Sequence, residues 1–284
     1  MKTIKYIWIF ALLLFLNVPV KAIEENENMD TVSDELLAGI QRTSKSSMDE
    51  QLKKFEAISH VISHRGASAQ AVEHTFEAYD LAIAQGSYYI EQDLVSSKDG
   101  TLYISHDLNA SRLTGYDGLY SQMSDSQINE LKTSSNEKIH TLQSVFDRYK
   151  TNTFYVIELK EAGQVDAFVN IVQKNGLEDF IIVQSNDENV IEQLEAKLPN
   201  IRKLLLVNKK SALDEAVHSS ADIISVKKSL MNRENLEKVR NSGKIFNVYT
   251  LDTPQEIIEA IQLGVDSYFT DDTQNAINYE LEYR

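Results

Sequence analysis

Short runs rich in β-branched and aromatic residues alternate with helical patterns from about residue 58 to the C-terminus, and this alternation limits the chain to few architectures. A strand followed by a helix, repeated eight times, predicts an α/β fold, a closed (β/α)8 TIM barrel. An open, doubly wound sheet is the alternative, but eight units favour closure. The predicted strands are Ile58–Ser63, Tyr88–Val95, Phe154–Leu159, Phe180–Gln184, Lys203–Val207, Asp222–Val226, Lys244–Tyr249 and Ser267–Thr270.

A small insertion interrupts the alternation between the second strand and its helix. It covers Lys98–Gln122 and contains a predicted short strand at Thr101–Ser105, directly after the Asp99-Gly100 turn. A segment that follows a barrel strand lies on the catalytic face of the barrel. The residues of the insertion are therefore expected to contribute to a functional site.

The N-terminal residues are not expected to belong to the barrel. Residues 1–22 have the layout of a secretory signal peptide, because a basic start precedes an apolar stretch and the small residue Ala22. The apolar stretch is short for a membrane span, which needs about 20 residues. An uncleaved N-terminal anchor is the alternative. We expect residues 23–57 to be an acidic leader, residues 58–284 to be the barrel domain, and the mature chain to be secreted without a stable membrane span.

Charge and cysteine content exclude several classes of protein. The formal net charge is −15, which disfavours binding to nucleic acid or to anionic lipid through the general field. An anionic substrate would therefore need a local cation, such as a metal ion or a well-placed arginine. The chain has no cysteine, so its fold has to be held by its core and not by disulfides.

Acidic residues end two of the predicted strands. Residues two apart in a strand share a face, so Tyr89, Glu91 and Asp93 point the same way from the second strand. Glu158 and Lys160 follow apolar residues on one face of the third strand in the same manner. An inward-facing carboxylate is costly unless it is paired or binds a cation, so these acids are expected at the functional mouth of the barrel.

Two histidines and an arginine are expected at the same mouth. His64 and Arg65 end the first strand, and His106 with Asp107 follows the short strand of the insertion. Hard carboxylate oxygens suit one divalent ion, Ca²⁺ or Mg²⁺. The ion and the cationic side chains would offset the charge of a phosphodiester, and two histidines can divide the work of general acid and general base.

Three ordered motifs carry a family likeness. HRGASAQAVEHT at His64–Thr75, YIEQDLVSSKDGTLYISHD at Tyr89–Asp107 and VIELK at Val156–Lys160 resemble the glycerophosphodiester phosphodiesterase family. The resemblance covers about Val61 to Asp272, which is nearly the whole predicted domain. It implies hydrolysis of a small-molecule glycerophosphodiester to glycerol 3-phosphate and an alcohol.

The resemblance also implies a role for each matching residue. His64 and His106 would act as acid and base, and one divalent metal ion would be bound by Glu91, Asp93 and Glu158. Arg65 and Lys160 would contact the substrate phosphate, and Glu73 would help to hold Arg65 or the metal. The family's Trp near the end of the seventh strand is Tyr249 here, a supporting residue of the wall that would face the substrate. The family's Pro before Glu73 is Val72.

Several alternatives and minor assignments remain at this point. The substrate would be a deacylated phospholipid or polyglycerol phosphate of a cell wall. A phospholipase-type phosphodiesterase acting on an intact lipid and a non-catalytic binding protein on the same fold are the other hypotheses. Asp107 is expected to shape its loop or to orient His106, and one of Asp271 and Asp272 to cap a helix. The remaining histidines are expected at the surface or in supporting positions, and these are His60, His74, His140 and His218.

Overall fold

The structure is a computed structural model that describes residues 59–284. The predicted signal peptide, the acidic leader and Ile58 lie outside the described residues. Within the described part, no helix is both long enough and apolar enough to cross a membrane.

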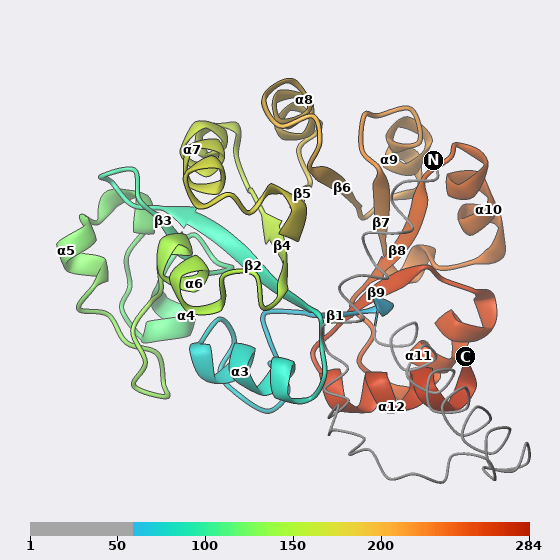
Figure 1. Ribbon diagram of the computed structural model, residues 1–284, viewed down its shortest axis with the longest axis horizontal. Helices are drawn as coiled ribbons and strands as arrows, with labels where there is room; N and C mark the ends of the chain where they lie inside the picture. Colours follow the sequence, from blue (N-terminus) through green and yellow to red (C-terminus); the bar gives the residue numbers. More distant parts are fainter. Residues whose placement is uncertain (1–58) are drawn as a thin grey trace, which may run out of the picture. The chain divides into compact units, whose positions relative to one another are not determined.

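Eight parallel strands close into a barrel, because β1 pairs with β9 on one side and with β2 on the other (Figure 1). This closure confirms the (β/α)8 prediction and excludes the open sheet. A ninth strand, β3, pairs antiparallel with the C-terminal residues of β2, Leu94–Ser96. The strands are β1 (Val61–Ser63), β2 (Tyr89–Ser96), β3 (Leu102–Ile104), β4 (Phe154–Glu158), β5 (Ile181–Ser185), β6 (Arg202–Val207), β7 (Ile223–Lys227), β8 (Ile245–Tyr249) and β9 (Ser267–Thr270).

A helix follows each barrel strand. The main helices are α3 (Phe76–Ala84), α6 (Leu142–Tyr149), α7 (Val165–Asn175), α8 (Glu188–Lys197), α9 (Lys210–Ala216), α10 (Arg233–Asn241), α11 (Pro254–Leu263) and α12 (Thr273–Tyr283). Short 3-10 turns lie at η3 (Ala162–Gln164), η4 (Glu178–Phe180) and η5 (Lys228–Leu230). Polar caps define several starts: Thr75 caps α3, Thr141 caps α6, and Thr253 forms a capping box with Glu256 at α11.

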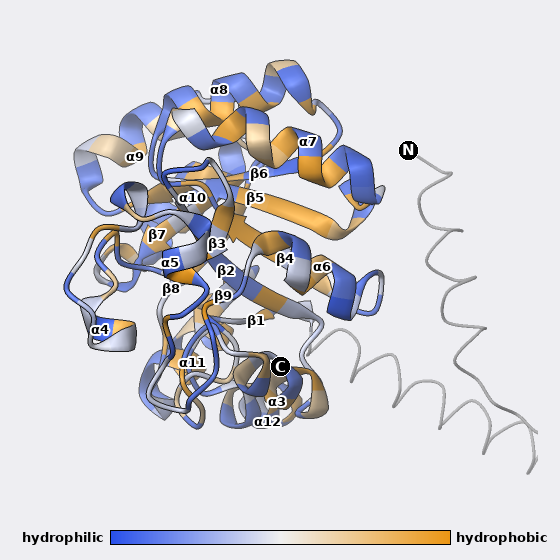
Figure 2. Cartoon of the chain, turned by 90° about the vertical axis from the view of Figure 1, so that its left-hand side faces the viewer, coloured by the Kyte–Doolittle hydropathy of each residue, from blue (hydrophilic) through white to orange (hydrophobic). Residues whose placement is uncertain are grey.

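Alternation along the strands divides the core into an inner and an outer layer. Inside the barrel, side chains such as Val156 and Phe269 pack together, with Tyr89 against them. Ile90 and Leu94, on the opposite face of β2, pack toward the surrounding helices. Figure 2 shows the hydrophobic strands β4 and β5 beneath helices of mixed hydropathy. The predicted inward face of β2 is therefore confirmed, and it carries Glu91 and Asp93 in the part of the strand that is paired with β4.

The insertion is longer than the sequence indicated. After β3 it includes α4 (Ser111–Thr114), η2 (Tyr120–Gln122) and α5 (Asp125–Ile128), and it ends only at α6. The predicted end at Gln122 was wrong because Ser124 and Gln127 form a capping box that starts a further helical turn. Ile128 then joins a small separate core with Tyr103 and Tyr120.

Gly66 allows the loop after β1 to approach α3 closely. Its φ is +87°, and a Cβ there would lie 2.7 Å from the carbonyl carbon of Ala78. Gly100 has the same φ of +87° but has no atom within 4 Å of such a Cβ.

Backbone strain alone is expected to cost Gly100→Ala about 1–2 kcal/mol. Because overpacking adds about 1–3 kcal/mol to that strain, Gly66→Ala should lower the free energy of unfolding by about 2–5 kcal/mol. Urea denaturation of both variants checks this, and equal losses would contradict the close contact.

Candidate active site

Three carboxylates converge where the pairing between β2 and β4 ends. Glu91, Asp93 and Glu158 each offer an oxygen, and these oxygens lie within 4.8 Å of one another. Asp93 and Glu158 are paired across neighbouring strands, which explains how residues 65 positions apart meet. Glu91 and Asp93 are each 1% exposed. Such a compact set of hard oxygen donors fits a Ca²⁺ or Mg²⁺ ion.

Polar groups around the three acids satisfy part of their charge. The Lys160 ammonium lies 2.8 Å from Asp93 Oδ1 and 3.3 Å from Glu158 Oε2. Glu91 accepts one hydrogen bond from the Arg65 backbone N–H and one from the Gln184 side chain, each at 2.9 Å. Lys160 thus reaches the site, where it contacts two of the three carboxylates.

Crowding and burial move the three carboxyl pKa values apart. Burial, then the neighbouring Asp93 charge, raises the pKa of Glu91 well above its usual value. Burial and the contact with Asp93 raise the pKa of Glu158 to about 8. Burial also opposes ionisation of Asp93, but the hydrogen bond from His74 and the charge of Lys160 outweigh it and hold its pKa well below the usual range. The cluster therefore holds protons that a cation would displace.

This arrangement gives an expected pH dependence of metal binding. Glu158 is protonated below its pKa of about 8 and must lose its proton to bind an ion. Affinity for Ca²⁺ or Mg²⁺ should therefore rise by at least about tenfold per pH unit from pH ~6 toward ~8, with release of at least one proton. Titration calorimetry in buffers of different ionisation enthalpy measures both quantities. Glu158→Gln is the control and should make the dependence less steep, because one of the groups that must lose a proton is gone. An affinity equal at both ends of this range in the wild type would contradict the prediction.

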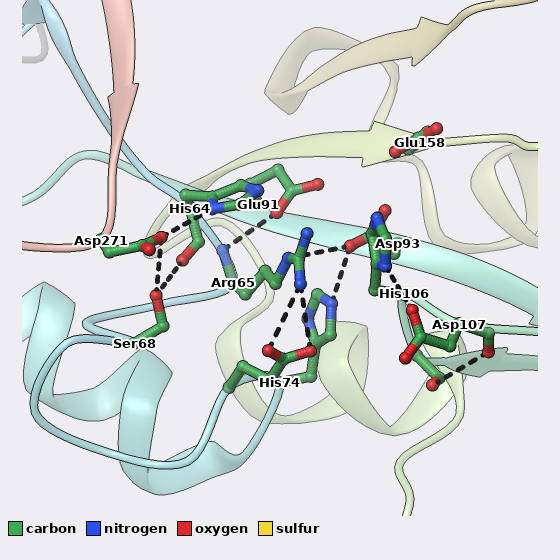
Figure 3. Close-up of polar contacts among 12 residues, drawn as sticks. His64, Arg65, Ser68, His74, Glu91, Asp93, His106, Asp107, Glu158 and Asp271 are labelled. Atoms are coloured by element: carbon green, nitrogen blue, oxygen red, sulfur yellow. Dashed lines mark hydrogen bonds and ion pairs between the residues drawn. The ribbon is translucent and has the colours of Figure 1, made fainter. Parts of the chain in front are cut away.

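Each predicted catalytic histidine is held at Nδ1 by an aspartate (Figure 3). His64 Nδ1 lies 2.6 Å from Asp271 Oδ1, and the Ser68 hydroxyl donates to the same oxygen at 3.0 Å. His106 Nδ1 lies 2.7 Å from Asp107 Oδ1, as expected for an orienting role of Asp107. A carboxylate on Nδ1 fixes the ring and leaves Nε2 to exchange protons.

Arg65 lies between two acids of the site. Its Nη1 donates to both Glu73 oxygens, at 3.2 and 3.3 Å, and its Nε lies 3.4 Å from Asp93 Oδ2. Glu73 therefore holds Arg65, and it is not part of the carboxylate cluster. Tyr249 lies half-buried at the end of β8 and packs against the inner core of the barrel, on the wall of the mouth.

Two residues support the site through contacts that the sequence did not specify. His74 is buried, with Nε2 2.9 Å from Asp93 Oδ2 and Nδ1 2.9 Å from the Tyr79 hydroxyl, so the surface interpretation was wrong and the supporting one holds. Asp271 binds His64, whereas Asp272 caps α12, as expected for one of the pair. The position of Asp271 at the end of the last barrel strand was the signal that could have found it.

The other two histidines with described contacts have structural surroundings. His140 stacks on Phe76, with ring centroids 3.6 Å apart, and it contacts Glu137. His60 Nδ1 lies 2.5 Å from the Asp266 carbonyl oxygen. His218 is exposed. None of the three lies in the carboxylate cluster.

Fold and site together define a (β/α)8 barrel with a cluster of three carboxylates beside two aspartate-bound histidines. Residues 64–275 match the model of the glycerophosphoryl diester phosphodiesterase family, and the chain belongs to that family. This confirms the resemblance in the sequence motifs.

Known proteins agree with the assignment. A glycerophosphodiester phosphodiesterase of Bacillus subtilis (strain 168) is 28% identical over 240 residues, covering 74% of this chain and 82% of that protein. A solved glycerophosphodiester phosphodiesterase of Agrobacterium tumefaciens is 27% identical with a TM-score of 0.68, covering 78% of this chain and 99% of its own. An Oleispira antarctica phosphodiesterase, solved in complex with the product sn-glycerol-3-phosphate, has the same fold at 24% identity and a TM-score of 0.72. The match covers 78% of this chain and 96% of that one.

Proposed function

We propose that this chain hydrolyses small-molecule glycerophosphodiesters to glycerol 3-phosphate and an alcohol, with one divalent cation held by Glu91, Asp93 and Glu158. The observation that carries the proposal is the meeting of these three carboxylates within 4.8 Å in a chain of this family. The name of the Bacillus subtilis relative supports the same activity.

The side chains present account for the remaining chemistry. The cation, when bound, would neutralise charge on the phosphoryl oxygens and polarise the phosphorus centre. Arg65, already fixed by Glu73, would bind a phosphate oxygen through its guanidinium, and Lys160 would add a second positive charge. His64 and His106 would divide proton transfer, one accepting the proton of the attacking hydroxyl and the other protonating the leaving alcohol. Both attack by water and attack by the neighbouring glycerol hydroxyl fit these roles.

Hydrolysis of a substrate panel tests the proposal. Glycerophosphocholine, glycerophosphoethanolamine and polyglycerol phosphate would each be incubated with Ca²⁺, with Mg²⁺ or with a chelator, and glycerol 3-phosphate would be measured. Metal-dependent release from at least one substrate is expected. If none is turned over although the protein is folded and binds the ion, a non-catalytic binding protein would be the better conclusion.

A second candidate is a phosphodiesterase that acts on an intact lysolipid. The insertion favours it because Leu108, Tyr116 and Leu119 are 59%, 48% and 38% exposed there. Leu108 lies two residues after His106, so the acyl chain of a lysolipid would have an apolar side chain to contact beside the site. Faster release of choline from lysophosphatidylcholine than from glycerophosphocholine would favour this candidate over the first.

We further propose that the chain is exported, on the strength of the signal-like residues 1–22. N-terminal sequencing of the protein from the culture medium tests this. A new N-terminus after Ala22 is expected, and a protein retained in the cell with its first residues intact would contradict export.

A further inference from the structure

We propose that Arg112 of the insertion is a positioning residue, which fixes His106 relative to Arg65 by binding Asp107 and Glu73 together. The inference rests on the proposed function, in which His106 transfers a proton and Arg65 binds phosphate. Arg112 lies on α4 and no sequence motif drew attention to it.

The contacts of Arg112 join two halves of the site. Its two terminal nitrogens donate to the two oxygens of Glu73, at 2.9 and 2.7 Å, and its Nε donates to Asp107 Oδ2. Glu73 also accepts from Arg65, and the other oxygen of Asp107 holds His106 Nδ1. One guanidinium therefore connects the proposed phosphate ligand on the β1 loop with the proposed proton-transfer group on the insertion.

The charges make this connection persistent. Burial opposes ionisation of Glu73, but the hydrogen bond from Arg112 and nearby positive charge lower its pKa to about 2. Burial likewise opposes ionisation of Asp107, and hydrogen bonds from Arg112 and His106 outweigh it, so its pKa is also lowered. Both carboxylates thus stay ionised near neutral pH and keep Arg112 between them.

The geometry requires an arginine. A planar guanidinium presents five N–H donors in a fixed fork, so it can bind one carboxylate with two nitrogens and a second carboxylate with Nε. A lysine ammonium is a point charge on a flexible stem and cannot hold both groups in one orientation. The His106 side chain is 41% exposed, so its placement depends strongly on Asp107 and hence on Arg112.

Arg148 supplies a matched control. It binds the two oxygens of Asp80 on α3, which is not one of the three clustered carboxylates, and its side chain is 45% exposed compared with 47% for Arg112. Arg112→Gln, Arg112→Lys and Arg148→Gln would be compared with wild type for kcat, KM, ion affinity and thermal midpoint. We expect Arg112→Gln to lower kcat about 10- to 100-fold, the scale for misplacing a reacting group. Arg112→Lys should recover only part of the loss, and the thermal midpoint should fall no more than in Arg148→Gln.

A double mutant and an exchange measurement complete the test. In an Asp107→Asn background, Arg112→Gln should cost clearly less than in wild type, because the two residues act on His106 in series. Equal losses in both backgrounds, or wild-type kcat in Arg112→Gln, would overturn the inference. If wild type turns over no substrate, the proposed function fails, and hydrogen exchange then decides. Faster amide exchange over residues 105–112 in Arg112→Gln supports the positioning contact, and unchanged exchange rejects it.

Discussion

Glu91→Gln is expected to lower kcat/KM for glycerophosphodiester hydrolysis by at least about 100-fold, the scale for removing one preorganised group that stabilises charge in the transition state. Glu91 is one of three carboxylates whose oxygens lie within 4.8 Å, and glutamine removes one negative charge from that set. Ion affinity should fall together with the rate. Steady-state kinetics at saturating ion and calorimetric titration of the ion measure the two effects.

A buried glutamate outside the site serves as the control. Glu280 is 1% exposed and pairs with Arg284 near the C-terminus. Glu280→Gln is expected to reduce stability while ion affinity and kcat stay close to wild type at a temperature where the variant is folded. If Glu91→Gln retained wild-type ion affinity, the ion would have to bind elsewhere.

His64→Ala and His106→Ala are each expected to lower kcat by at least about 100-fold, since a general acid or base contributes on that order. Unlike Glu91→Gln, both variants should keep the ion affinity of wild type, because neither imidazole lies in the carboxylate cluster. His218→Ala, at an exposed position, is the matched control and should be unchanged. Retention of wild-type kcat in either active-site variant would remove that histidine from proton transfer.

The two histidines should differ with the leaving group. The variant that lacks the general acid should lose less activity on a p-nitrophenyl ester, because that leaving group needs no protonation. The variant that lacks the general base should lose a similar factor on both kinds of substrate. Equal behaviour of the two variants would argue against a division of roles.

The fold and the carboxylate cluster could be predicted because both follow from local patterns. The two-residue period of β2 places Glu91 and Asp93 on one face, and the closed barrel then brings the end of β4 beside them. The same rule placed His64 and Arg65 at this mouth, since they follow β1. Strand ends in a parallel barrel meet at one face whatever their separation in the chain.

The supporting contacts could not be predicted, because they join segments whose relative position no periodicity sets. His74 reaches Asp93 from the loop before α3, and Arg112 reaches Glu73 from the insertion. Val72, where the family has proline, packs against the small core of the insertion. That core includes Ile128, which lies beyond the predicted end of the insertion. Neither the extent of this core nor the role of Val72 could therefore be predicted from local pattern.

A crystal soaked in Mn²⁺, recorded at the manganese absorption edge, tests the central claim most directly. We expect one anomalous peak within about 2.0–2.6 Å of oxygens from Glu91, Asp93 and Glu158, the range of Mg²⁺ and Ca²⁺ bonds to oxygen. No peak at these three carboxylates, in a crystal whose protein hydrolyses glycerophosphodiesters only when a divalent ion is present, would contradict it.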